Sequence, residues 1–285
     1  MVTPMTKDGF INYQMLEKLI DFQIDNKVDA LVLCATTGEG ATLAESEHHD
    51  VLRHAVLHSK KRIKIIAGVG SNDTEKSKRL TLQAKECGVD ALLCVTPYYN
   101  KTTQTGLVRH YNAIADLTDL PLILYNVPSR TGMNISPTTY KQLSHHQNIV
   151  AVKEANPDVS QVEKTIQLCG DDLAVYSGND DLTLPFLSLG AKGVVSVVSN
   201  LFPFEMGELC RSFFKGDLNK SREYTFKLLP IIEVLFSELN PIPIKHALSI
   251  LGFDCGRCRM PLCEPSEATI KRLETLLNAN KPSPI

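Results

Sequence analysis

The sequence lacks the features that mark several large classes of protein. No apolar stretch approaches the roughly 18 residues of a membrane-spanning helix. The start, Met1-Val2-Thr3-Pro4, has neither the basic nor the apolar segment of a signal peptide. The 30 basic and 32 acidic residues leave a net charge of -2, without any block of like charges. We therefore expect a cytoplasmic protein whose partners include neither nucleic acid nor a membrane.

Metal-binding patterns are equally scarce. Most of the eight cysteines stand inside apolar segments, as is typical of reduced thiols packed in a protein interior. The exception is Cys255-Gly256-Arg257-Cys258, with Cys263 close behind. A structural zinc site usually needs four ligands, and no second pair of suitable spacing follows. We interpret this segment as a loop and predict no metal site.

Short apolar runs alternate with longer helical patterns along most of the chain. Seven runs are predicted as strands: Ala30–Cys34, Ile63–Gly68, Ala91–Val95, Leu122–Tyr125, Ile149–Lys153, Leu173–Ser177 and Gly193–Val197. Helices are predicted before and between them: Tyr13–Asp25, Glu45–Ser59, Thr74–Glu86, Gly106–Leu117, Pro137–Leu143, Val159–Leu168, Leu182–Leu189 and Phe204–Phe214. Strands that alternate with helices pair in parallel, and eight such units form a (β/α)8 TIM barrel, which is the predicted fold.

The eighth strand of this barrel is hard to find. Only Met1-Val2-Thr3 precedes the first turn, so we expect a shortened first strand or one that begins upstream of this sequence. An open doubly wound sheet is the alternative, and it is less favoured because no Gly-x-Gly-x-x-Gly turn follows any strand. After about Lys215 only helical patterns remain. We predict a catalytic barrel over residues 1–216 and a helical C-terminal domain over residues 217–285.

Lys153 is the most informative single residue. It ends the apolar run Ile149–Val152, so a buried strand would carry it to the rim of a core. An ammonium group there needs water or a partner. Desolvation favours a neutral amine, which can attack a carbonyl group. Taken alone, however, a solvated lysine is the more common explanation, so the other strand ends must decide.

The other predicted strand ends also carry polar side chains, and in a barrel the chemistry lies at these ends. They are Thr36, Thr37, Tyr98, Tyr99, Tyr125 and Arg130. Each has an ordinary explanation as a turn former, a packed tyrosine or a solvated arginine. Their occurrence together favours imine formation at Lys153. Hydroxyl groups could carry protons, while the Thr36–Gly38 turn and Arg130 could each hold a carboxylate.

Three segments carry a resemblance to a known family: Thr36-Thr37-Gly38-Glu39, Tyr125-Asn126-Val127-Pro128-Ser129-Arg130-Thr131-Gly132 and Val152-Lys153-Glu154-Ala155. They resemble the motifs of the class I pyruvate-dependent lyases typified by dihydrodipicolinate synthase. The likeness extends from Val2 to about Pro265 and includes Glu238–Lys245. Sialic-acid lyases and keto-deoxy-sugar aldolases share the lysine and the Thr-Gly-Glu turn but generally lack the arginine.

The resemblance implies a role for each matching residue. Lys153 would form a Schiff base with pyruvate, and Tyr125, Thr36 and Tyr99 would relay protons, with Tyr99 reaching in from a neighbouring subunit. Thr37 would hold the pyruvate carboxylate, and Arg130 the carboxylate of aspartate-β-semialdehyde. The carbonyl groups of Gly178 and Val195 would border the pocket. The family is usually homotetrameric and uses no organic cofactor or catalytic metal.

Two alternatives and one departure accompany this reading. The chain could be another pyruvate aldolase that acts on a sugar acid or a hydroxy-oxo acid, or a non-catalytic relative that binds a keto acid. The departure concerns feedback inhibition by lysine. Tyr98, His48 and Asn72 match the effector site of inhibited relatives, but Glu45 replaces a common histidine and Lys76 replaces a glutamate. Lys76 would repel the amino group of the effector, so we predict little or no inhibition by lysine.

Overall fold

The computed structural model describes residues 1–279 and divides the chain into two compact units. The first unit comprises Met1–Ile65 and the chain from Ser196 onward, and the second comprises Ile66–Val195. The strands form one seven-stranded sheet in sequence order, from β1 to β7. The last six residues of the predicted C-terminal domain, 280–285, lie outside the described part.

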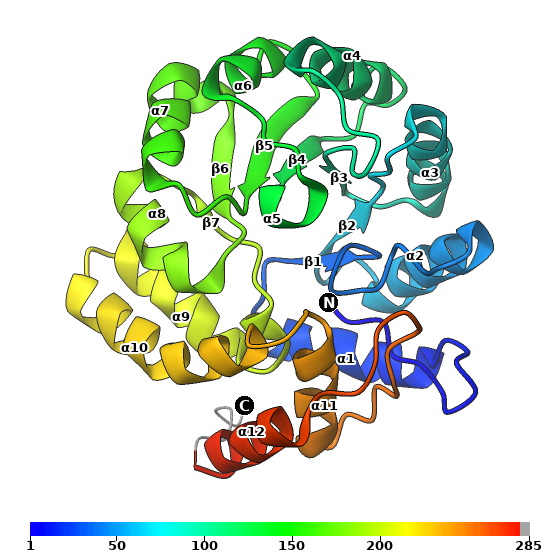
Figure 1. Cartoon of the computed structure of the whole chain (residues 1–285), viewed down its shortest axis with the longest axis vertical. Helices are drawn as coiled ribbons and strands as arrows, with labels where there is room; N and C mark the ends of the chain where they lie inside the picture. Colours follow the sequence, from blue (N-terminus) through cyan, green and yellow to red (C-terminus); the bar gives the residue numbers. More distant parts are fainter. Residues whose placement is uncertain (280–285) are drawn as a thin grey trace. The chain divides into compact units, whose positions relative to one another are not determined.

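The second unit is a parallel sheet covered by helices (Figure 1). Its strands are the end of β2 (Lys64–Gly68), β3 (Ala91–Val95), β4 (Leu122–Asn126), β5 (Ile149–Glu154), β6 (Ala174–Ser177) and β7 (Gly193–Val194), and all pairs from β2 to β7 are parallel. Its helices are α3 (Thr74–Cys87), α4 (Gln104–Ala115), α5 (Pro128–Thr131), α6 (Pro137–Leu143), α7 (Val159–Cys169) and α8 (Thr183–Leu189).

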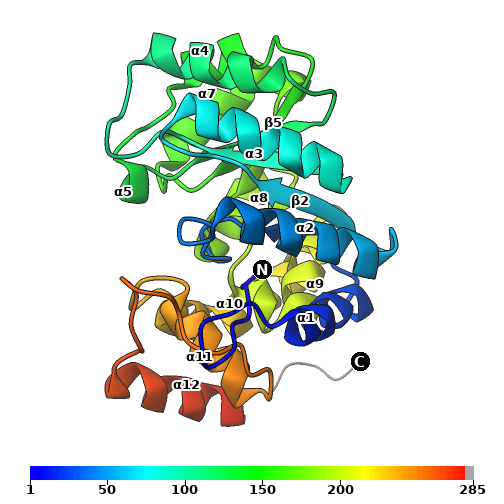
Figure 2. The same cartoon turned by 90° about the vertical axis from the view of Figure 1, so that its right-hand side faces the viewer.

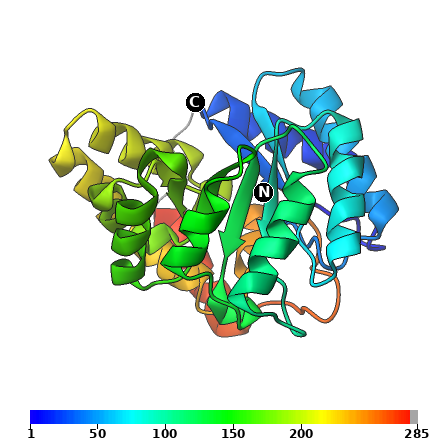
Figure 3. The ribbon, with the colours of Figure 1, turned by 90° about the horizontal axis from the view of Figure 1, so that it is seen from above.

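The sequence explains why these strands lie inside. All five residues of β4 are buried, as expected for a parallel strand with both faces covered. Helices α3, α4, α6 and α7 flank the outer side of the strands, and the side view and the view from above show the same layer (Figures 2 and 3). Side-chain caps fix where these helices begin: Asp73 accepts the N–H of Glu75, and Ser136 accepts that of Thr139. Because the strands are parallel, their carboxyl ends lie at one edge of this unit.

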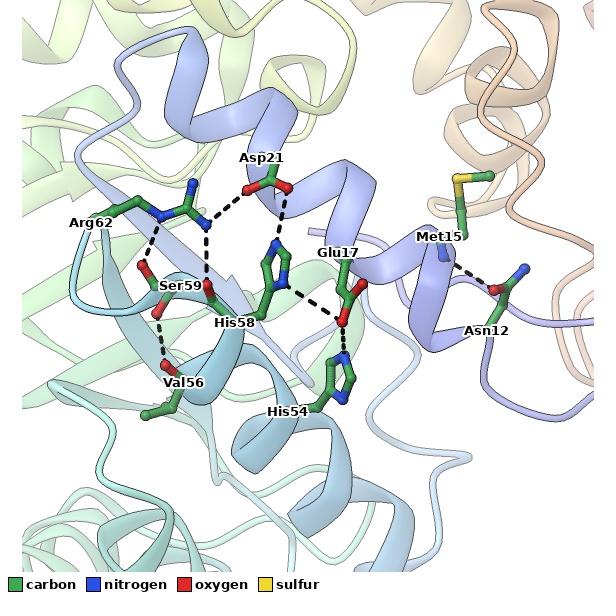
Figure 4. A network of polar contacts seen from close by, with 9 residues as sticks. All are labelled: Asn12, Met15, Glu17, Asp21, His54, Val56, His58, Ser59 and Arg62. Atoms are coloured by element: carbon green, nitrogen blue, oxygen red, sulfur yellow. Dashed lines mark hydrogen bonds and ion pairs between the residues drawn. The ribbon is translucent and has the colours of Figure 1, made fainter.

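The described part of the first unit contains one complete strand and six α-helices. The elements are α1 (Tyr13–Asp25), β1 (Ala30–Leu33), α2 (Glu45–Ser59), α9 (Pro203–Phe214), α10 (Leu218–Leu235), α11 (Ile242–Ile250) and α12 (Glu267–Ala279). Polar contacts join α1 to α2 (Figure 4). The imidazole of His54 lies 2.9 Å from Glu17 Oε1, and that of His58 lies 3.0 Å from Asp21 Oδ2. Arg62 donates to the other oxygen of Asp21 at 2.8 Å.

The seven strands and the eight helices whose ranges were predicted are present among the described residues, with ends that differ by a few residues. The largest difference is β7, predicted over Gly193–Val197 but formed only by Gly193–Val194. The chain then turns into a 3-10 helix, Val198–Asn200, because local backbone hydrogen bonds replace the sheet ladder there. Helix α5 was not predicted, since a four-residue turn after a Val-Pro step has no helical periodicity.

Within the described residues, no strand precedes α1. Met5 forms only an isolated antiparallel bridge with Ile11. Among residues 1–279, no helix is long and apolar enough to cross a membrane. In the same part of the chain, no three histidine, cysteine, aspartate or glutamate side chains gather in a way that could hold a metal ion.

Candidate active site

Lys153 and Tyr125 form the centre of the candidate site in the second unit. The register of β4 and β5 pairs these two residues at the carboxyl ends of their strands. Lys153 Nζ lies 4.4 Å from the centroid of the Tyr125 ring. Both residues are buried, with 7 % and 6 % of their surfaces exposed. The parallel register thus brings together an amine and a phenol that are 28 positions apart in the sequence.

The backbone around this pair is closely packed. The N–H of Thr96, which follows β3, donates to the carbonyl of Tyr125 at 3.0 Å. The N–H of Gly178, which follows β6, donates to the carbonyl of Glu154 at 2.7 Å. A Cβ atom on Gly178 would lie only 2.7 Å from the Cβ of Ala155, so this position requires glycine. The N–H of Val195 donates to the carbonyl of Ser177 at 2.8 Å. Gly178 and Val195 therefore lie at the ends of the strands next to Lys153.

Two predicted site residues of this unit are exposed. Arg130 lies in the short helix α5, directly after β4. Tyr99 follows β3, with 91 % of its surface exposed and a positive φ of 69°. A left-handed backbone is uncommon for a tyrosine, and the side chain is almost fully exposed to solvent. A phenol presented in this way is suited to contact another protein molecule.

Thr36 and Thr37 lie in the first unit, in the turn after β1. The hydroxyl of Thr37 accepts a hydrogen bond from Asn240 Nδ2 at 2.9 Å. The same turn contains Glu39, which is buried and has a positive φ of 54°. Lys245 Nζ of α11 donates to Glu39 Oε1 at 2.7 Å. The turn therefore contains one member of an ion pair with α11, and both members of this pair are almost completely buried.

This ion pair was not anticipated from the sequence. Glu39 and Lys245 are 206 positions apart, and no local pattern links them. The one available signal was the position of Lys245 within the apolar helix Ile242–Ile250, where a buried lysine needs an acidic partner. Removing one member would leave the other charge buried without a counter-charge, so we expect the pair to stabilise the turn that contains Thr36 and Thr37.

Glu154, the residue after Lys153, is a buried carboxylate with several donors. Its Oε1 accepts from Asn126 Nδ2 at 2.9 Å and from the N–H of Asn156 at 2.8 Å. Its Oε2 accepts from the hydroxyl of Tyr140 at 2.8 Å and from Gln161 Nε2 at 3.3 Å. Burial raises the pKa of Glu154 to about 7, because the desolvation of the carboxylate outweighs these hydrogen bonds.

This raised pKa predicts a pH-dependent stability. The folded carboxyl keeps its proton between its ordinary pKa of 4.5 and about 7, whereas the unfolded one loses it. Unfolding then releases a proton, so the contribution of Glu154 to stability falls as the pH rises across this window. We expect the free energy of unfolding of the unmodified protein to fall by on the order of 3 kcal/mol between pH 5 and pH 7.5 because of this group. Glu154→Gln should not show this fall. Denaturant unfolding of both proteins at the two pH values measures it. An equal change in both proteins would contradict the assignment.

A parallel α/β sheet with a buried, strand-end lysine beside a tyrosine is an arrangement suited to amine chemistry on a carbonyl compound. Comparison with known proteins agrees with this class. Residues 1–280 match the model of the dihydrodipicolinate synthetase family. A 4-hydroxy-tetrahydrodipicolinate synthase of Clostridium perfringens is 48 % identical over 280 residues, which cover 98 % of this chain and 96 % of that protein.

Solved structures give the same result. A dihydrodipicolinate synthase from Aquifex aeolicus superposes with a TM-score of 0.96 at 43 % identity, covering 98 % of this chain and 95 % of that chain. A lysine-bound synthase of the same kind from Cyanidioschyzon merolae superposes with a TM-score of 0.95 at 37 % identity, covering 98 % and 95 %. The chain belongs to the dihydrodipicolinate synthetase family.

Proposed function

We propose that the chain is a 4-hydroxy-tetrahydrodipicolinate synthase, a lyase of the diaminopimelate and lysine pathway that condenses pyruvate with L-aspartate-4-semialdehyde. The observation that carries this proposal is the buried pair of Lys153 and Tyr125 at the ends of β5 and β4. It occurs in a chain that is 48 % identical to a protein with this name over nearly its whole length.

The reaction begins with an imine. The amine of Lys153 attacks the keto carbon of pyruvate, and the carbinolamine loses water. Tyr125, Thr36 and a Tyr99 from a neighbouring subunit carry the protons that these steps require. The imine loses a proton from its methyl group to give an enamine, whose carbon attacks the aldehyde. The amine of the second substrate then displaces Lys153 and closes the ring. These steps need no metal and no organic cofactor.

The remaining site residues bind the two carboxylates. Thr37 is assigned to the pyruvate carboxylate, since its hydroxyl is oriented by Asn240. Arg130 is assigned to the carboxylate of the semialdehyde, because a guanidinium group can hold it through two parallel hydrogen bonds. The carbonyl groups of Gly178 and Val195 border the pocket. Their backbone positions beside β5 and β6 support this assignment.

The fold we propose is a closed (β/α)8 barrel with a C-terminal helical domain, divided near residue 216. Contacts of the first residues support closure: the amino group of Met1 donates to the carbonyl of Val32 in β1 at 2.7 Å, and the N–H of Val2 donates to Asn200 at 3.1 Å.

We further propose a cytoplasmic homotetramer. The exposed ring of Tyr99 supports an assembly in which one subunit completes the site of another.

A coupled assay tests the proposed reaction. Purified protein supplied with pyruvate and aspartate-4-semialdehyde should give a product that the next reductase of the pathway reduces with a nicotinamide cofactor. Activity with a sugar acid or a hydroxy-oxo acid, and none with the semialdehyde, would favour the alternative of another pyruvate aldolase. Binding of keto acids without turnover would indicate a non-catalytic relative.

We also predict that lysine inhibits the enzyme little or not at all. The positively charged Lys76 of α3 would face the amino group of the effector, and Glu45 replaces a common histidine. A lysine titration of the coupled assay measures this, with Lys76→Glu as the matched variant that should become more sensitive. Half-inhibition of the unmodified enzyme at sub-millimolar lysine would contradict the prediction.

A further inference from the structure

The carboxylate of Glu154 lies at the centre of a hydrogen-bond network that has no part in the proposed reaction. Its four donors come from four places in the second unit: Asn126 at the end of β4, Tyr140 in α6, Asn156 after β5 and Gln161 in α7. The side chain of Asn134 extends the network, since its Oδ1 accepts from Asn126 at 2.8 Å. Glu154 is 2 % exposed, so these contacts are shielded from bulk solvent.

The register of the sheet connects this network to the candidate site. Tyr125 is paired with Lys153, and the next residues along the two strands, Asn126 and Glu154, are paired with each other. Successive side chains of a strand point to opposite faces. The amine and the phenol therefore share one face of β4 and β5, while the amide and the carboxylate share the other, one position further along.

The carboxylate of Glu154 accepts every hydrogen bond that it makes with the neighbouring amide groups. An ionised carboxylate only accepts, and the groups of Asn126, Asn156 and Gln161 that face it only donate. Glu154 Oε1 links the side chain of Asn126 at the end of β4 to the loop that follows β5, beside the backbone hydrogen bond from the N–H of Ala155 to the carbonyl of Asn126 at 2.8 Å. Such charge-assisted hydrogen bonds are stronger than neutral ones. The last two residues of each strand are thus fixed relative to each other behind the reacting groups.

We propose that Glu154 is a positioning residue for imine formation: its contacts with Asn126 and Asn156 hold the ends of β4 and β5 so that Lys153 and Tyr125 keep their separation. This inference rests on the proposed role of Lys153. A displacement of about 1 Å between reacting groups can cost roughly a hundredfold in rate. Loss of the carboxylate should therefore slow the covalent step, whereas binding of pyruvate should change little.

The test compares Glu154→Ala with Glu154→Gln and with a control, Leu107→Ala. Glutamine can place its oxygen at the Oε1 position and accept from Asn126 and Asn156, while its amide nitrogen donates to the hydroxyl oxygen of Tyr140 and gives up only the 3.3 Å contact with Gln161. Leu107 is completely buried in α4, so its truncation destabilises the second unit by leaving a cavity and touches none of these hydrogen bonds. Each protein is mixed with pyruvate at pH 8 and quenched with borohydride at increasing times, and intact mass spectrometry gives the trapped fraction.

We expect Glu154→Ala to lower the rate constant of trapping at saturating pyruvate by about ten- to a hundredfold, with little change in the half-saturating pyruvate concentration. Glu154→Gln should restore the rate to within about threefold of the unmodified enzyme, and Leu107→Ala should keep the full rate. Equal rates for the unmodified enzyme and Glu154→Ala would overturn the proposal, as would an equal slowing by Leu107→Ala.

Two further observations keep the test decisive. If Glu154→Ala does not fold, Asn126→Ala removes the same link from β4 and should slow trapping similarly. If instead it traps at the full rate, the positioning role is contradicted. If the unmodified protein traps no pyruvate at all, the proposed function fails first, and that failure is distinct from a failure of the positioning role alone.

Discussion

We expect replacement of Lys153 with methionine to lower the rate of condensation by at least about a thousandfold, because the proposed imine with pyruvate forms on the amine of Lys153. Methionine fills nearly the same buried volume, so the second unit should remain folded. Lys153→Arg tests the chemistry more narrowly, since arginine keeps the positive charge but is not deprotonated near neutral pH. The coupled assay measures both variants.

Lys164→Met serves as the control, because Lys164 is an exposed lysine of the neighbouring helix α7. This variant should keep full activity. Near-normal condensation by Lys153→Met, with circular dichroism showing a folded protein, would refute the assignment of the nucleophile. Loss of activity accompanied by unfolding would require the comparison to rest on Lys153→Arg.

Replacing Arg130 with alanine is expected to lower kcat/KM for aspartate-4-semialdehyde by roughly a hundredfold, which corresponds to the loss of a two-point contact with a carboxylate. Arg130 is exposed in α5, so its removal should leave the fold unchanged. Borohydride trapping of pyruvate should proceed within about twofold of the normal rate. Arg130→Lys should fall between the two, since lysine keeps the charge without the fork geometry.

Arg109→Ala is the matched control, because Arg109 is an exposed arginine of α4. Its kcat/KM for both substrates should not change. If Arg130→Ala slows trapping of pyruvate as much as it slows condensation, the residue acts on the first substrate or on the fold. If Arg130→Ala changes neither trapping of pyruvate nor condensation, the carboxylate of the second substrate is bound by another residue. The hypothesis of an aldolase with a different specificity is then favoured.

The sequence predicted the strand order and the pair at the centre of the site because both follow from local patterns. An apolar run that ends in Lys153 indicates a buried strand with a polar end, and parallel pairing then places Tyr125 beside it. The extent of β7 was overestimated for the same reason. Gly193–Val197 is apolar, but apolarity alone cannot distinguish a sheet ladder from a 3-10 turn.

The supporting contacts could not be predicted in this way. Glu154 receives donors from residues up to 28 positions away, and Glu39 is paired with Lys245 at a distance of 206 positions. Glu39 and Glu154 each lie in one of the three segments that carry the family resemblance, and the sequence assigned neither of them a supporting role. Burial showed that they are structural centres, and burial of a charged side chain depends on the whole fold.

The most direct test of the account is trapping of the imine itself. The protein is incubated with pyruvate and borohydride, digested, and mapped by mass spectrometry. We predict one stable adduct, the reduced pyruvate imine, on the peptide that contains Lys153, and no adduct in Lys153→Met. The absence of any adduct on the unmodified protein, or an adduct on a different lysine, would contradict the claim that Lys153 is the nucleophile.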